Sequence, residues 1–90
     1  MTPKQIWKAL DRYTTELDKD VSSLRFPGSE TNPSSTESLA HVRWMVDEAK
    51  KFATTKPAKA MRWLCFVQGV LWRDGDWSIN EFKDDNKGED

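Results

Sequence analysis

One segment constrains the fold of this chain more than any other: residues 61–72, with the sequence MRWLCFVQGVLW. Read as a helix, the segment and the residue before it place apolar side chains on two faces: Ala60, Leu64, Val67 and Leu71 on one, and Trp63, Phe66 and Val70 on another. A surface helix carries a single apolar stripe, so a helix that is apolar nearly all round has to be covered on several sides. The segment therefore predicts a central helix, a self-associating helix, or both.

Two small residues interrupt the large ones in this helix. Gly69 costs about 1 kcal/mol relative to alanine inside a helix, so it indicates close approach of another backbone or ring. Cys65 lies among apolar neighbours, and we expect it to be buried as a small hydrophobic residue. It is the only cysteine, so no disulfide can form within the chain.

The spacing of apolar residues predicts helices on either side of this segment. Residues at intervals of four and three recur from Ile6 to Leu24 and again from Leu39 to Ala53. Sequences typical of a capping box, in which two residues three apart bond each other's backbone, begin at three sites: Thr2, Ser34 and Ser78. We therefore expect helices over about 3–24, 35–52, 57–73 and 78–86, with a loop at 25–35.

These helices predict an all-α fold, a small three-helix bundle with a short C-terminal helix. The helix at 57–73 should lie in the middle and mediate self-association, most simply as a two-fold dimer. Residues 1–82 should form a single helical domain. Residues 83–90 contain nothing apolar to bury, and we expect a flexible acidic tail there.

The charge balance argues against a nucleic-acid partner, and the short apolar runs argue against a membrane. Fourteen Lys and Arg face fifteen Asp and Glu, whereas a dedicated nucleic-acid binder usually has a basic excess. The chain begins without an apolar run, and its longest apolar stretch is shorter than the 20 or so residues that span a bilayer. We therefore expect a soluble, cytosolic protein with no membrane association.

The residue types also argue against catalysis and metal binding. His41 is the only histidine, and no second histidine or thiol stands at metal-ligand spacing. We expect His41 to lie at the surface, or between surface and core, on the helix at 35–52, paired with Glu37 one turn earlier. No nucleophile–base or acid–base pair can be assembled, so the sequence predicts no enzymatic activity, no metal and no cofactor.

The five tryptophans suggest protein binding instead. Tryptophan and arginine are enriched at interface hot spots, and the chain places them next to each other more than once. We expect four of these residues to anchor a protein partner: Arg43, Trp44, Arg73 and Trp77. The alternative is that the rings pack along the edge of the bundle.

Basic residues gather where the second helix meets the third. Thr55 and Lys56 come just before the helix at 57–73, and Lys59 and Arg62 lie in its first two turns. Backbone amides at a helix N-terminus together with lysines can bind an anion. This corner supports an alternative function, an oligomeric binder of a phosphate-bearing small molecule or of nucleic acid. A solvated corner that only keeps the protein soluble explains the same residues.

Residues 60–72, AMRWLCFVQGVLW, followed by SINEF at 78–82, resemble small proteins of unassigned function that recur in bacteriophage genomes. The resemblance covers roughly residues 39–86 and not the N-terminal helix. It implies a phage accessory protein made in a bacterial cytoplasm, and it assigns no functional residue. Such proteins often bind a host or phage protein, in host takeover or counter-defence, so we expect a non-enzymatic inhibitor or modulator.

Overall fold

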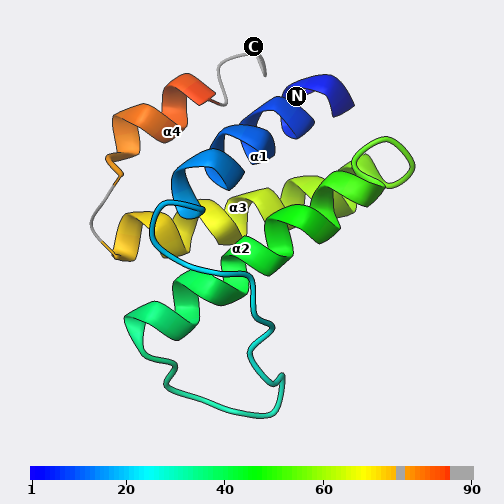
Figure 1. The fold of residues 1–90 in the computed structure, drawn as a ribbon. Coiled ribbons are helices and arrows are strands. Elements are labelled where there is room, and N and C mark those ends of the chain that lie inside the picture. Colours follow the sequence, from blue (N-terminus) through cyan, green and yellow to red (C-terminus); the bar gives the residue numbers. More distant parts are fainter. Residues whose placement is uncertain (75–76, 86–90) are drawn as a thin grey trace.

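The computed structural model describes residues 1–74 and 77–85, and it confirms the all-α fold (Figure 1). Four helices follow in order: α1 (Pro3–Leu17), α2 (Ser35–Phe52), α3 (Pro57–Arg73) and α4 (Ile79–Asp85). No strand occurs in the described ranges. None of the helices described is long and apolar enough to cross a bilayer.

The three predicted capping boxes set where the helices begin. The Thr2 hydroxyl accepts from the Gln5 amide at 3.2 Å, and the Gln5 side chain accepts from the Thr2 amide at 2.7 Å. Ser34 and Glu37 make the same pair of bonds ahead of α2, as do Ser78 and Glu81 ahead of α4. Each box satisfies amides that would otherwise lack a partner, so these helices start where the sequence predicts.

Three helices share one hydrophobic core. α2 packs against both α1 and α3, whereas the interface between α1 and α3 is smaller. Most of the residues predicted to line the helix faces are fully buried, among them Ile6, Leu10, Val42, Val46, Leu64 and Val67. The prediction that the helix at 57–73 lies in the middle is therefore wrong, because α2 occupies that place and leaves one side of α3 uncovered.

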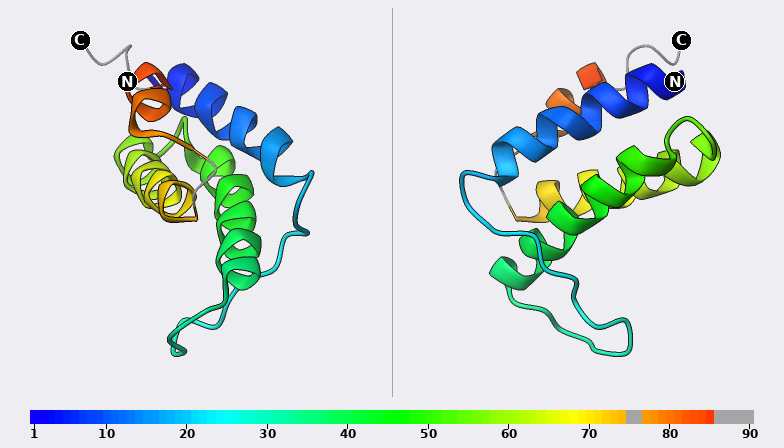
Figure 2. Two further views of the ribbon diagram at one scale, coloured as in Figure 1. Left: turned by 90° about the vertical axis from the view of Figure 1, so that its left-hand side faces the viewer. Right: turned by 45° about the vertical axis from the view of Figure 1, so that its right-hand side comes forward.

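Tyr13 anchors the C-terminal part of the chain onto α1. Its ring is fully buried and makes edge contacts with Trp77 and Phe82, whose own rings stack at 5.8 Å. The Gln68 amide donates a hydrogen bond of 2.9 Å to the Tyr13 hydroxyl, which ties α3 to α1. These contacts hold α4 alongside α1 (Figures 1 and 2).

α1 is shorter than predicted, because it ends at Leu17 and not near residue 24. Carboxylates at Glu16, Asp18 and Asp20 crowd this end, and negative charge disfavours a helix C-terminus. Residues 18–34 instead form a long connection that reaches past the start of α2 (Figure 2). Apolar spacing continues through this stretch, but Leu24 is 68% exposed.

The predicted boundary of the domain at residue 82 falls inside α4. Lys83, Asp84 and Asp85 continue that helix, so the predicted tail at 83–90 does not begin where the apolar residues stop. The remainder of the tail, residues 86–90, lies outside the described residues, as does the last residue of the helix predicted at 78–86.

Candidate interaction surface

After its first turn, α3 exposes a set of side chains that together form what we call the outer face of α3: Arg62, Cys65, Phe66, Gly69, Trp72 and Arg73. The 3.6-residue period of a helix brings these positions onto one arc, with Gly69 near its middle. Opposite them lie the buried Leu64, Val67 and Leu71. The apolar segment of the sequence is therefore covered on one side only.

Large hydrophobic side chains are concentrated on this face. Phe66 and Trp72 are 56% and 53% exposed, and Ile79 of α4, beside Trp72, is 53% exposed. Single exposed hydrophobic residues are ordinary, but contiguous ones indicate an interaction surface. These three account for most of the large hydrophobic residues exposed in the described chain.

Two shallow grooves flank Gly69 and join the exposed residues into one surface. The first, of about 290 Å³, lies between α3 and α4 and is lined by Trp72, Ile79 and Phe82. The second, of about 330 Å³, includes Phe66 and the side chain of Ser38 from the start of α2. Gly69 borders both grooves, so the apolar surface runs without interruption across α3.

A third groove continues this surface toward the long connection. It measures about 350 Å³ and is lined by Phe26, Pro27, Val42 and Phe66, among others. His41 lines it too, and its Nδ1 accepts a hydrogen bond of 3.1 Å from the Phe26 amide.

This bond overturns the pairing predicted for His41. The Glu37 carboxylate instead accepts from the Ser34 amide in the capping box that opens α2. Burial lowers the pKa of His41 from its usual 6.5, and the charge of Arg25 lowers it further. The neutral imidazole, with Nδ1 as acceptor, is therefore the form that holds the connection in place.

Gly69 has open space above it. A Cβ built there would meet nothing within 4 Å, so no backbone or ring among residues 1–74 and 77–85 makes the close approach predicted from the glycine. Cys65 is also exposed, which corrects the prediction that it is buried. Both residues lie on the side of α3 that the bundle leaves uncovered.

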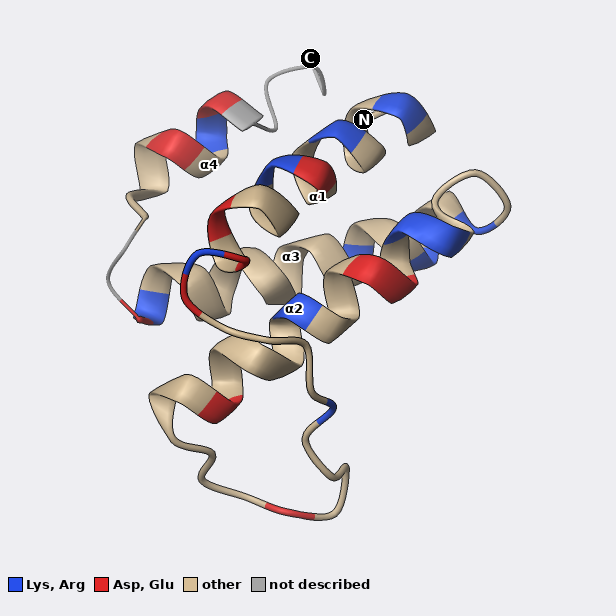
Figure 3. Ribbon diagram, in the orientation of Figure 1, with Lys and Arg blue, Asp and Glu red and all other residues tan. Residues whose placement is uncertain are grey.

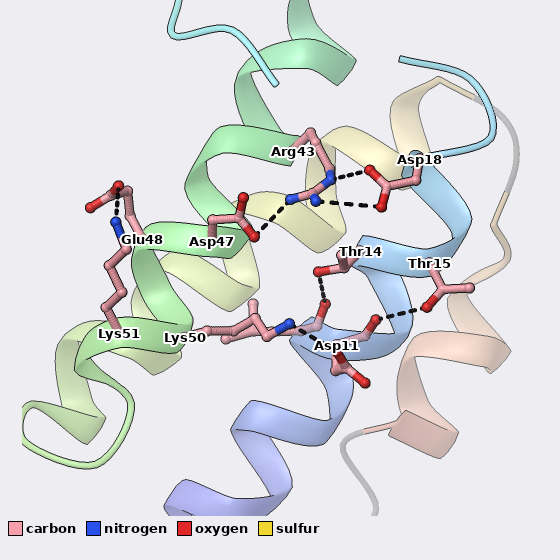
Figure 4. Close-up of polar contacts among 10 residues, drawn as sticks. Asp11, Thr14, Thr15, Asp18, Arg43, Asp47, Glu48, Lys50 and Lys51 are labelled. Carbon is pink, nitrogen blue, oxygen red and sulfur yellow. Dashed lines mark hydrogen bonds and ion pairs between the residues drawn. The ribbon is translucent and has the colours of Figure 1, made fainter. Parts of the chain in front are cut away.

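Between α1 and α2, away from the outer face of α3, Arg43 and Lys50 are held in ion pairs. Arg43 Nε lies 2.6 Å from Asp18 Oδ1, and its Nη1 lies 2.8 Å from Asp47 Oδ1 (Figure 4). Lys50 reaches Asp11 at 2.8 Å, so two basic residues of α2 pair with carboxylates of α1 and of its C-cap residue, Asp18. The hydrogen bond from Arg43 lowers the pKa of Asp18 and offsets the negative charge at the end of α1.

The structure does not bring the four predicted protein-binding anchors together. Arg43 is held by two carboxylates, and only 11% of its side chain is exposed. Trp44 stacks on His41 and packs against Trp63, with Arg25 over its ring.

The other two anchors lie at the C-terminal end of α3 (Arg73) and between α3 and α4 (Trp77). Trp77 packs on Tyr13 and Phe82, with Arg12 over its ring. Arg73 is exposed and lies on the outer face of α3. No described contact joins any two of the four anchors, so Arg73 alone coincides with the surface that the bundle leaves open.

The predicted anion corner is only partly assembled. Thr55, Lys56 and Arg62 are exposed, but the Lys59 ammonium lies over the rings of Phe52 and Trp63, at 4.8 and 5.5 Å from their centroids. Pro57 occupies the first helical position and has no amide to offer an anion. Lys59 is thus engaged in a contact with aromatic rings of the bundle.

Among residues 1–74 and 77–85, no cluster of three or more acidic, histidine or cysteine side chains is placed to hold a metal ion. Comparison with known proteins adds no further assignment: no family model, no curated protein and no solved structure matches this chain.

Proposed function

We propose that this chain is a non-enzymatic interaction protein that binds another protein through the outer face of α3. The observation that carries the proposal is the continuous apolar surface of Phe66, Gly69, Trp72 and Ile79, which the bundle leaves uncovered. Exposed rings cost the free protein solubility and contribute little to its core, so their concentration on one face favours a role in binding.

Gly69 supports the same proposal. Among the described residues nothing lies within 4 Å of a Cβ added at Gly69, yet glycine inside a helix costs about 1 kcal/mol relative to alanine. A partner that approaches the α3 backbone between Phe66 and Trp72 gives that position a physical reason.

The proposed setting is a bacterial cytoplasm, with a host or phage protein as the partner. The resemblance of residues 60–72 to small phage proteins supports this setting, and the proposed action is inhibition or redirection by occupying a surface. Self-association through α3 uses the same face, so a second copy of the chain and a different protein are competing occupants of it.

Affinity purification from infected cells, followed by mass spectrometry, tests the proposal with matched variants. Phe66→Ala/Trp72→Ala removes the two exposed rings and should abolish capture of the partner. Leu24→Ala, which truncates an equally exposed hydrophobic residue in the connection, should leave capture intact. Both proteins should unfold within about 1 kcal/mol of the parent, because the altered side chains are largely exposed.

Capture that survives in the double variant would contradict the proposal. The alternative function, phosphate-led binding through Thr55, Lys56, Lys59 and Arg62, makes a different prediction about salt. Binding through phosphate contacts should weaken steeply between 50 and 200 mM salt. Binding through Phe66 and Trp72 should weaken much less, since it depends on apolar burial.

A further inference from the structure

The outer face of α3 has an apolar centre between two arginines that make no ion pair within the described part of the chain. Arg62 and Arg73 are both exposed, and neither makes an ion pair with any described residue. Eleven positions separate them, which is three helical turns, so they share one side of α3 about 16 Å apart along its axis. Figure 3 shows blue near both ends of α3 and tan between them.

α3 has no carboxylate of its own to balance these charges. Its sequence from Pro57 to Arg73 contains no Asp or Glu, in contrast to α2, where Arg43 and Lys50 are paired. Two carboxylates border the adjoining grooves, those of Glu30 and Asp74. Asp74 Oδ1 accepts from the Ser35 hydroxyl at 3.3 Å, and its buried Oδ2 has no hydrogen-bond partner.

The shape of the face fits a helix. Phe66 rises on one side of Gly69 and Trp72 with Ile79 on the other, so the glycine is a low point between exposed rings. An amphipathic helix binds such a surface by laying its apolar stripe between the rings. Its charged residues then fall at the rim, where complementarity with Arg62 and Arg73 sets the choice of partner.

We infer that the outer face of α3 binds a partner's amphipathic helix whose apolar stripe is flanked by two acidic residues about three turns apart. This inference rests on the proposed function and adds the chemistry of the partner. A second copy of the chain fits less well, because its α3 brings two more arginines to the interface and no carboxylate.

A library of single amphipathic helices displayed on yeast, about 20 residues long and randomised at the positions that flank a fixed apolar stripe, tests this inference. Selection on the full-length protein should enrich helices with Asp or Glu at two positions about three turns apart. Arg62→Glu/Arg73→Glu should weaken binding of the enriched helices about tenfold or more and should select basic flanks instead. Lys4→Glu/Lys8→Glu makes the same charge change on α1 and should leave binding unchanged.

Three outcomes of the selection would overturn the inference. They are the enrichment of no helix, enriched helices without an acidic excess, and equal effects of the two charge-reversal variants. Sedimentation that shows a dimer which Phe66→Ala/Trp72→Ala disperses would assign the face to a second copy and also overturn it. If capture from cells still depends on Phe66 and Trp72, the proposed function stands although this inference fails.

Discussion

The two sides of α3 both carry large apolar residues, but those on the inner side are buried and those on the outer side are exposed. On the inner side, Leu64 and Val67 are fully buried, and Gln68 is tied to Tyr13 by a hydrogen bond. On the outer side, Phe66 and Trp72 are more than half exposed around Gly69, where an added Cβ would meet no described atom within 4 Å. The hydrophobicity of a residue in a helix therefore does not decide whether it lies in the core or on an open surface. What decides this is whether other parts of the chain cover it.

Truncating one residue from each side of α3 tests whether the two sides differ in their contribution to stability. Leu64→Ala should lower the free energy of unfolding by about 2–5 kcal/mol, because it opens a cavity in the core. Phe66→Ala should change it by less than about 1 kcal/mol, because the ring is 56% exposed. Urea unfolding followed by circular dichroism measures both. Similar losses in the two variants would place Phe66 in the core and contradict the account.

A second contrast lies between the ion pairs of Arg43 and Lys50 on α2 and the arginines of α3, Arg62 and Arg73, which pair with no described residue. Arg43→Ala should destabilise the protein by roughly 1 kcal/mol, because its carboxylate partners are half exposed and such pairs contribute little each. Arg73→Ala should leave thermal stability nearly unchanged. Loss of partner capture in Arg43→Ala without loss of stability would restore Arg43 as a binding anchor.

Gly69→Ala tests whether the outer side of α3 is open at its centre. The added methyl group meets no neighbour within 4 Å, and alanine favours the helix, so unfolding should require up to about 1 kcal/mol more. The same methyl group should weaken capture of the partner, because it fills the low point between the rings. A variant that is less stable than the parent would show that α3 packs there after all.

The smallest expected effect concerns the connection that borders the third groove. Because burial and Arg25 lower the pKa of His41 in the folded state, the unfolded chain binds a proton first as the pH falls below 6.5. Stability from this group is thus present above pH 6.5 and is lost on acidification.

His41→Asn separates this effect from other titrations. Its side-chain oxygen can accept from the Phe26 amide but does not titrate. Urea midpoints at pH 7.5 and pH 5 should therefore differ less in His41→Asn than in the parent. An equal pH dependence in the two proteins would show that His41 makes no contribution.

The sequence predicts the helices well, since their boundaries depend on local chemistry. Thr2, Ser34 and Ser78 cap three of the four helices where the pattern indicates. The error at the end of α1 arose because apolar spacing continues to Leu24, whereas the carboxylates at Asp18 and Asp20 disfavour further helix. At this point the apolar spacing favours a longer helix and the charges favour its end, and the helix ends at Leu17.

The candidate surface is harder to predict, because it depends on what covers each residue. The sequence indicates that the segment 61–72 carries more apolar surface than one stripe. It does not indicate that α2 takes the central place, nor that Cys65 and Phe66 face outward. Residue type and adjacency in the sequence predict Arg43, Trp44 and Trp77 as anchors, but each has contacts within the fold that neither signal reveals.

The rate at which Cys65 reacts with an uncharged maleimide tests the open outer face of α3 most directly. Cys65 lies on that face beside Gly69 and is the only thiol in the chain. If the outer face is open, the folded, unbound protein should react nearly as fast as the urea-unfolded chain, and a bound partner should slow the reaction strongly. A slow reaction in the free protein at low concentration, or an equal rate with the partner bound, would contradict it.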